Sequence, residues 1–253
     1  IIRLLRNKVS ACTLLSLFSF LLWSSLYVWC TTREPKQSPE WCSRVVTLLH
    51  GSIAAMAGLA LCGVTNITEC RLTAKLTPQH YALMVWSWGY FAFDLLWCLI
   101  YWYKNWLMLA HHACALAAIT LYLNKEDTGC IFPCTMAMME ITNPLLQTRW
   151  FLKAKGQDKS IIYFLVEILY LAMFISLRGV LGTYIIYKAV KSNIFDKETK
   201  IISIIFYIVS LAFINEIFGY VFYKYKTQIV SMSTWLNLPV SGKAPWATQE
   251  AVD

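Results

Sequence analysis

The chain has 253 residues, of which 58% are hydrophobic and only 14% charged, and its mean hydropathy is +0.53. This composition excludes an ordinary soluble domain and indicates a membrane protein. The formal net charge is +8, carried mostly by loops and ends, as basic flanks beside membrane spans usually are. Because no arginine-rich element stands free of the apolar segments, we expect no nucleic-acid partner.

Several apolar stretches reach the roughly 20 residues needed to cross about 30 Å of hydrocarbon. In chain order, the expected spans are 11–30, 44–64, 80–103, 106–123, 131–152, 161–187 and 201–223. The fifth is interrupted by Pro133 and Pro144, so we expect a kinked or broken helix there. The predicted fold class is all-α: a polytopic membrane helical bundle of seven transmembrane helices, or six if 131–152 does not cross.

The two ends of the chain are expected to differ. Residues 1–40 form an N-terminal transmembrane helix and its loop. This helix is expected to remain uncleaved, because large aromatic residues and no small-residue cleavage pattern end the apolar run. Residues 227–253 form a polar tail that we expect to be disordered. Lys and Arg divide ten to eleven between the faces of a seven-span bundle, so the positive-inside rule leaves orientation open.

The second span is rich in Gly, Ala and Ser, which lets neighbouring helices approach closely and predicts a central position in the bundle. In the loop that follows, Asn66-Ile-Thr68 is a glycosylation sequon, relevant only if the loop is luminal. Of nine cysteines, those in spans, such as Cys62, are expected to pack as small apolar residues. One loop bridge, for example from Cys70, is left open.

The third and fourth spans place ionisable side chains at depth. If both are helical around a turn near 103–106, Asp94 lies roughly 15 Å and His111 roughly 10 Å below the same surface. A helical hairpin therefore brings Asp94 near His111 and His112. Ionisable groups inside hydrocarbon are costly and mark a functional site by default.

Other intramembrane polar groups lie in the later spans. Glu140-Ile-Thr-Asn143-Pro144 interrupts the fifth span and is expected to line the same interior as Asp94. Glu167 and Arg178 are eleven residues apart, hence on one helix face, and we expect Arg178 to pair with Glu167 or with Glu216 in a structural role.

These motifs resemble the TLC-domain family, which includes the ceramide synthases. The resemblance is carried by Arg44-Val-Val-Thr-Leu-Leu-His50-Gly, Tyr90-Phe-Ala-Phe-Asp94-Leu, His111-His112 and Glu140-Ile-Thr-Asn-Pro144, in this order, and covers roughly residues 41–226. It implies a bundle around a lipid-accessible cavity, residence in the endoplasmic reticulum or another endomembrane, and work on acyl-chain or sphingoid lipids.

The match to the synthases is partial. Their paired catalytic histidines match His111 and His112, but their later His-Asp-x-x-Asp pattern reads Met139-Glu140-Ile-Thr-Asn143 here. We therefore place a lipid-binding or regulatory role in lipid homeostasis ahead of acyl transfer.

Three functions stay open. The first is non-enzymatic binding of membrane lipids. The expected cavity-lining residues are His50, Met136, Met139, Asn143 and Arg149. The second is acyl transfer with acyl-coenzyme A as co-substrate, for which the candidate catalytic residues are His111, His112, Asp94 and Glu140. The third is zinc-dependent lipid hydrolysis by three histidines and a carboxylate, although no His-Glu-x-x-His spacing is present. We expect no resident cofactor and no metal, and a homodimer is compatible with this reading.

Overall fold

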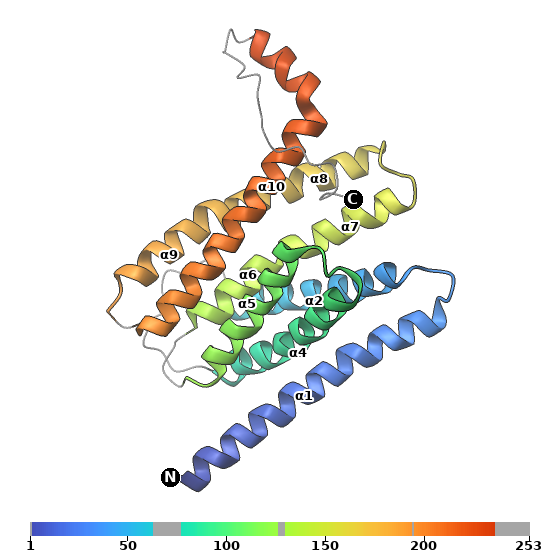
Figure 1. Cartoon of the computed structure of the whole chain (residues 1–253). Coiled ribbons are helices and arrows are strands. Elements are labelled where there is room, and N and C mark those ends of the chain that lie inside the picture. The colour runs from blue at the N-terminus through green and yellow to red at the C-terminus, as the bar shows by residue number, and fades with distance from the viewer. Residues whose placement is uncertain (1, 63–76, 126–129, 194, 236–253) are drawn as a thin grey trace.

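The computed structural model describes residues 2–62, 77–125, 130–193 and 195–235, and all regular elements in these ranges are helices (Figure 1). They are α1 (Ile2–Arg33), α2 (Pro39–Cys62), α4 (Pro78–Tyr101), α5 (Trp106–Leu123), α6 (Ile131–Glu140), α7 (Thr142–Ala154), α8 (Ile161–Phe174), the π-helical segment η1 (Ile175–Leu181), α9 (Gly182–Lys191) and α10 (Lys197–Trp235). The predicted all-α fold class is confirmed.

Six helices in the described ranges are long and apolar enough to cross a membrane. They comprise Ala11–Arg33, Pro39–Cys62, Pro78–Tyr101, Trp106–Leu123, Ile161–Lys191 and Lys197–Lys226. The chain is therefore an integral, multi-pass membrane protein. The remaining expected span, 131–152, is instead the pair α6 and α7, which follow one another through the bundle beside α2 (Figure 1).

Local sequence explains where the helices begin. Thr77 precedes α4, and its hydroxyl accepts a hydrogen bond from the His80 amide at 3.3 Å. Asn105 does the same for α5 through the Met108 amide, and Ser160 does so for α8. Each side chain satisfies an amide that the first helical turn leaves unpaired, so the short loops end at predictable positions.

Small residues allow several helices to pack closely against one another. α2 packs against α1, α4, α6 and α7, which confirms its predicted central position. A Cβ atom added to Gly58 would lie 2.4 Å from the Cβ atom of Ala137 on α6. Likewise, a Cβ atom at Gly89 would lie 2.5 Å from the Phe20 backbone nitrogen, where α4 meets α1. Only glycine permits these approaches.

The break in the fifth span comes slightly earlier than expected. The helix is interrupted at Ile141, and Pro144 lies in the first turn of α7. Proline is tolerated there, because the amide it lacks has no partner within a first helical turn. The break leaves Glu140 at the end of α6, facing the bundle interior.

The expected disorder of the C-terminal tail is wrong for its first residues. α10 has a kink at Tyr225 but continues to Trp235, so the first residues of the tail 227–253 are helical rather than disordered. Residues 227–235 contain no proline or glycine to stop the helix. The rest of the tail lies outside the described residues.

The expectation that Cys62 acts only as an apolar packing residue was wrong. Cys62, the last residue of α2, forms a disulfide with Cys134 of α6. The close approach of α2 and α6 around Gly58 brings their Cα atoms to 5.7 Å. Cys130 is also disulfide-bonded. Cys70 and Asn66 lie outside the described residues.

Candidate functional site

The α4–α5 hairpin brings together Asp94 and the paired histidines His111 and His112. Nε2 of His112 lies 3.1 Å from Oδ2 of Asp94, and both side chains are buried. The predicted meeting of the carboxylate with the paired histidines is therefore present in the structure. An imidazole that donates one nitrogen to a carboxylate has a defined tautomer and orientation.

Two neighbours of this pair were not predicted. The Ser43 hydroxyl donates to Oδ1 of Asp94 at 3.5 Å, and the Cys98 sulfur lies 3.7 Å from Nδ1 of His112. Cys98 follows Asp94 by four residues on the same face of α4, which is a signal that sequence spacing could have supplied. Ser43 comes from α2 and becomes a neighbour only through packing.

A second buried acidic residue, Glu140, is held by two other side chains. The Asn143 amide donates to Oε2 of Glu140 at 2.6 Å, and Nδ1 of His50 lies 3.5 Å from the same oxygen. His50 stacks on Tyr90 at 3.8 Å, and its Nε2 lies 3.2 Å from the Ser87 hydroxyl. These contacts fix Glu140 beside the break between α6 and α7.

The adjacent histidines point to different neighbours, as a rotation of about 100° per residue requires. His111 packs against Phe206 and Phe213 of α10, with ring centroids 5.4 and 5.3 Å away, whereas His112 faces Phe91 of α4. Nδ1 of His111 is buried and has no hydrogen-bond partner among the described residues. Of the two adjacent histidines, His111 is thus the one with a buried nitrogen that has no hydrogen-bond partner among the described residues.

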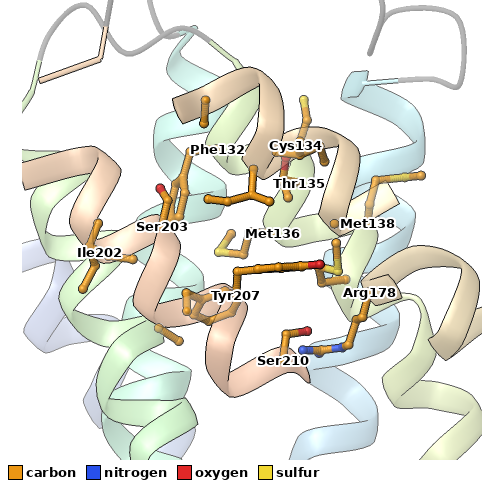
Figure 2. A pocket seen from close by; sticks show the side chains of 18 of the residues that line it. Phe132, Cys134, Thr135, Met136, Met138, Arg178, Ile202, Ser203, Tyr207 and Ser210 are labelled. Carbon is orange, nitrogen blue, oxygen red and sulfur yellow. The ribbon is translucent and has the colours of Figure 1, made fainter. Parts of the chain in front are cut away.

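Two cavities meet at this site. The apolar cavity, of about 360 Å³, lies between α5, α6, α9 and α10. Figure 2 shows Phe132, Cys134 and Thr135 toward one end of it and Arg178 and Ser210 toward the other. The polar cavity, of about 280 Å³, contains Asp94 and His112. Both are lined by Phe91, His111, Glu140 and Arg178, which therefore lie at the junction.

Four of the residues that we expected to line a cavity are divided between the apolar and the polar cavity. Met136 and Met139 line the apolar cavity, whereas Asn143 and Arg149 line the polar one. The expectation for His50 was wrong: it lines neither cavity and is fully enclosed behind Glu140. Its stacking on Tyr90 turns it away from the open space.

Arg44, which belongs to the first family motif, lines the polar cavity. Its Nε lies 2.8 Å from Glu40, and Nη1 donates to the Gln147 side chain at 3.1 Å. The guanidinium also lies over the Trp150 ring at 4.6 Å. These contacts join α2 to α7 at the rim of the polar cavity.

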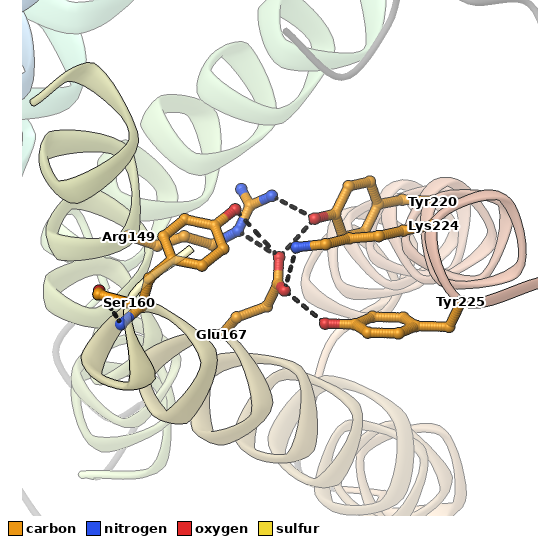
Figure 3. A network of polar contacts seen from close by, with 7 residues as sticks. Arg149, Ser160, Glu167, Tyr220, Lys224 and Tyr225 are labelled. Carbon is orange, nitrogen blue, oxygen red and sulfur yellow. Dashed lines mark hydrogen bonds and ion pairs between the residues drawn. The ribbon is translucent and has the colours of Figure 1, made fainter. Parts of the chain in front are cut away.

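The expected pair between Glu167 and Arg178 is not formed. Glu167 is fully buried and instead accepts hydrogen bonds from side chains of α7, α8 and α10: Arg149, Tyr163, Tyr220, Lys224 and Tyr225 (Figure 3). Eleven residues correspond to about 16 Å along a helix, beyond the reach of the two side chains. Nor does any ion pair link Arg178 to Glu216 within the described ranges.

The three-histidine zinc site considered above does not form either. Over the described residues, two sets of side chains are close enough to share a metal ion. One combines His80 with the disulfide-bonded Cys62 and Cys134, whose sulfurs are already bonded to each other. The other is Asp94, Cys98 and His112, so His50 and His111 do not join it.

Comparison with known proteins agrees with the motifs. The family description "TLC domain" matches residues 40–227. One curated relative, TLC domain-containing protein 4 A of Dictyostelium discoideum, is 26% identical over 190 residues, which cover 68% of this chain and 71% of that protein. No solved structure matches. The chain thus belongs to the TLC-domain family.

Proposed function

We propose that this protein binds a membrane lipid, with an acyl or sphingoid chain in the apolar cavity and the head group in the polar cavity. The observation that supports the proposal is the junction of the two cavities at Phe91, His111, Glu140 and Arg178. One space is lined largely by apolar side chains, whereas the other also contains several ionisable ones, among them Asp94 and His112, which suits an amphiphile. Their volumes fall near the lower end of small-molecule sites, about 300–1,000 Å³.

The proposed role is non-enzymatic and lies in lipid homeostasis within an endomembrane. The polar cavity offers hydrogen-bonding side chains already oriented by their neighbours, since Asp94 is held by Ser43 and His112. Such preorganisation lowers the cost of fixing a head group. The methionines Met136 and Met139 supply adaptable apolar contacts for a chain.

A cavity-filling variant tests this proposal. Ala118 is buried in the apolar cavity, so Ala118→Phe should lower the amount of lipid that co-purifies, measured by native mass spectrometry and lipid extraction, by about tenfold, or about 1.4 kcal/mol. The matched control is Val180→Phe, because Val180 is 71% exposed. Equal lipid content in both variants and in the unmodified protein would contradict the proposal.

Acyl transfer is the second candidate, favoured by the buried His112–Asp94 pair and by the unpartnered Nδ1 of His111 at the cavity junction. In this reaction an imidazole nitrogen attacks the thioester carbonyl of acyl-coenzyme A. The bond to sulfur breaks, the imidazole proton passes to the departing thiolate, and the acyl group moves from the imidazole to an acceptor.

Intact-mass spectrometry after incubation with long-chain acyl-coenzyme A separates the two functions. An added acyl mass that disappears in both His111→Ala and the His111/His112 double alanine variant would support acyl transfer. A bound lipid without any covalent mass would support binding alone. If neither is observed with a folded protein, both candidates fail.

A further inference from the structure

The junction between the two cavities contains a cation that has no carboxylate or hydrogen-bond partner among the described residues. Arg178, in η1, is 5% exposed and lines both cavities. Within the described part of the chain its side chain makes no hydrogen bond and no ion pair, and its Nε is buried. Its one specific contact is with the Phe174 ring, whose centroid lies 4.9 Å from Cζ.

The other two arginines that line the polar cavity each have a carboxylate partner. Arg44 and Arg149 each place Nε 2.8 Å from a carboxylate oxygen, of Glu40 and Glu167 respectively. A guanidinium has five N–H donors and no acceptor. Burying one without compensation is strongly unfavourable, so a partner for Arg178 is expected.

The nearest acidic residue does not fill this role. Glu140 attracts Arg178 electrostatically, but their side chains do not approach within ion-pair distance, whereas Asn143 and His50 contact the Glu140 carboxylate directly. The contacts of this carboxylate within ion-pair or hydrogen-bond distance are thus with Asn143 and His50 among the described residues. Glu140 therefore does not serve as a hydrogen-bond acceptor for the Arg178 guanidinium.

A second buried nitrogen belongs to a residue of the same junction. Nδ1 of His111 is buried without a partner, and His111, like Arg178, lines both cavities. π-helical turns are uncommon and frequently occur at functional sites, and η1 is the element that supplies Arg178. Arg178 and His111 each have a buried nitrogen that is unpaired among the described residues. Both line the junction, where the head group of a lipid would lie if its chain occupied the apolar cavity.

We propose that the lipid bound by this protein carries an anionic oxygen group, a carboxylate or a phosphate, next to its chain, and that Arg178 and His111 bind this group. The inference rests on the proposed lipid-binding function and specifies the ligand class. Planar guanidinium donors match the oxygens of both anions. With the anion at the junction, the chain extends into the apolar cavity.

The test compares three single-chain lipids of equal chain length on the delipidated full-length protein in nanodiscs: a fatty acid, a lysophosphatidic acid and a neutral monoacylglycerol. We expect one or both anionic lipids to bind at least about tenfold more tightly than the neutral one. Arg178→Met should remove this preference while keeping the affinity for monoacylglycerol. Lys191→Met is the matched control, since Lys191 is exposed and lines neither cavity.

The outcomes separate this inference from the function on which it rests. Tight binding of the carboxylate alone, or of the phosphate alone, identifies the source of the anion. Equal binding of all three lipids by the unmodified protein would overturn the anionic class and leave lipid binding intact. No binding of any lipid would overturn both. The comparison on the unmodified protein holds even if Arg178→Met fails to fold, and Arg178→Lys, which keeps the charge, should retain part of the preference.

Discussion

Asp94 and His112 meet across the α4–α5 hairpin, with 3.1 Å between Oδ2 and Nε2, and each side chain is 9% exposed. The pair lies in the wall of the polar cavity, next to the junction with the apolar one. A buried carboxylate and imidazole at this distance restrain two helices at one point, so the pair contributes to both the stability of the hairpin and the shape of the cavity.

Single substitutions of His112 and of Asp94 should lower the free energy of unfolding by unequal amounts. His112→Ala leaves a buried carboxylate with only the weak Ser43 contact, and losing one partner of a buried pair costs about 3–5 kcal/mol. Asp94→Ala leaves a buried imidazole without its carboxylate partner, at about 1–3 kcal/mol. Thermal unfolding in nanodiscs should therefore show the larger loss for His112→Ala, and the double variant should be more stable than His112→Ala alone.

The control for this cycle is Leu96→Ala, on the exposed face of the same helix, which should change the unfolding midpoint little. Strictly additive effects of the two substitutions would show that Asp94 and His112 do not interact, and would contradict the geometry.

Glu167 is predicted to be the main polar contact between α7, α8 and α10. Glu167→Gln leaves Arg149 and Lys224 without their shared carboxylate, so we expect a loss of about 3–5 kcal/mol. Adding Lys224→Met removes one of the two unpaired cations and should restore part of the stability.

Glu216→Gln is the matched control for Glu167→Gln, because Glu216 is exposed and forms no ion pair within the described ranges. An unfolding temperature for Glu167→Gln equal to that of this control would show that the network in Figure 3 contributes nothing.

The Cys62–Cys134 disulfide closes a separation of 72 residues. Its removal by Cys134→Ser should lower stability by about 2–4 kcal/mol, whereas Cys114→Ser, at a free cysteine, should have little effect. Similar melting of the two variants would indicate that the bridge is not formed in the membrane.

The same bridge gives a testable membrane orientation. Disulfides persist in oxidising compartments, and Cys62 ends α2, so we expect this end of the bundle to face the lumen. The stretch of sequence that follows α2 contains the Asn66 sequon. A glycan-dependent gel shift that Asn66→Gln abolishes would support luminal placement, and the absence of any shift in a glycosylating host would count against it.

Asp196 should titrate unusually low. Lys125 hydrogen-bonds its carboxylate, which lowers the pKa of Asp196 from its ordinary value of 3.8 to about 2. Because the folded pKa is the lower one, the contribution is present above about pH 4 and is lost as the pH falls toward 2. The pair is exposed, so its effect stays below about 1 kcal/mol. Lys125→Met should return the pKa toward 3.8, measured by NMR titration, and an unchanged pKa would disprove the pairing.

Sequence reasoning predicted what local periodicity and span length determine. It predicted the helical class, the central second helix, the break near Pro144 and the meeting of Asp94 with the paired histidines, since one short turn leaves few ways to place them. It failed where three helices converge. The partners of Glu167 come from α7, α8 and α10, and no spacing within one segment reveals them.

Arg178 shows a different limit of prediction from the sequence. Its spacing from Glu167 suggested a shared helix face, but three turns separate the two charges by about 16 Å, and η1 departs from the α-helical repeat between them. The cavity junction, likewise, depends on how α5, α6, η1 and α10 pack and cannot be read from any one of them.

The most direct test of the account maps a bound lipid onto the two cavities. A single-chain lipid with a photoreactive group at the chain end should, after irradiation and peptide sequencing, label α6 or α10 around Met136 and Tyr207, which line the apolar cavity. Ala118→Phe should suppress this labelling and Val180→Phe should not. Labelling confined to the exposed faces of α1 and α8, unchanged by Ala118→Phe, would contradict the claim that the bundle encloses a lipid.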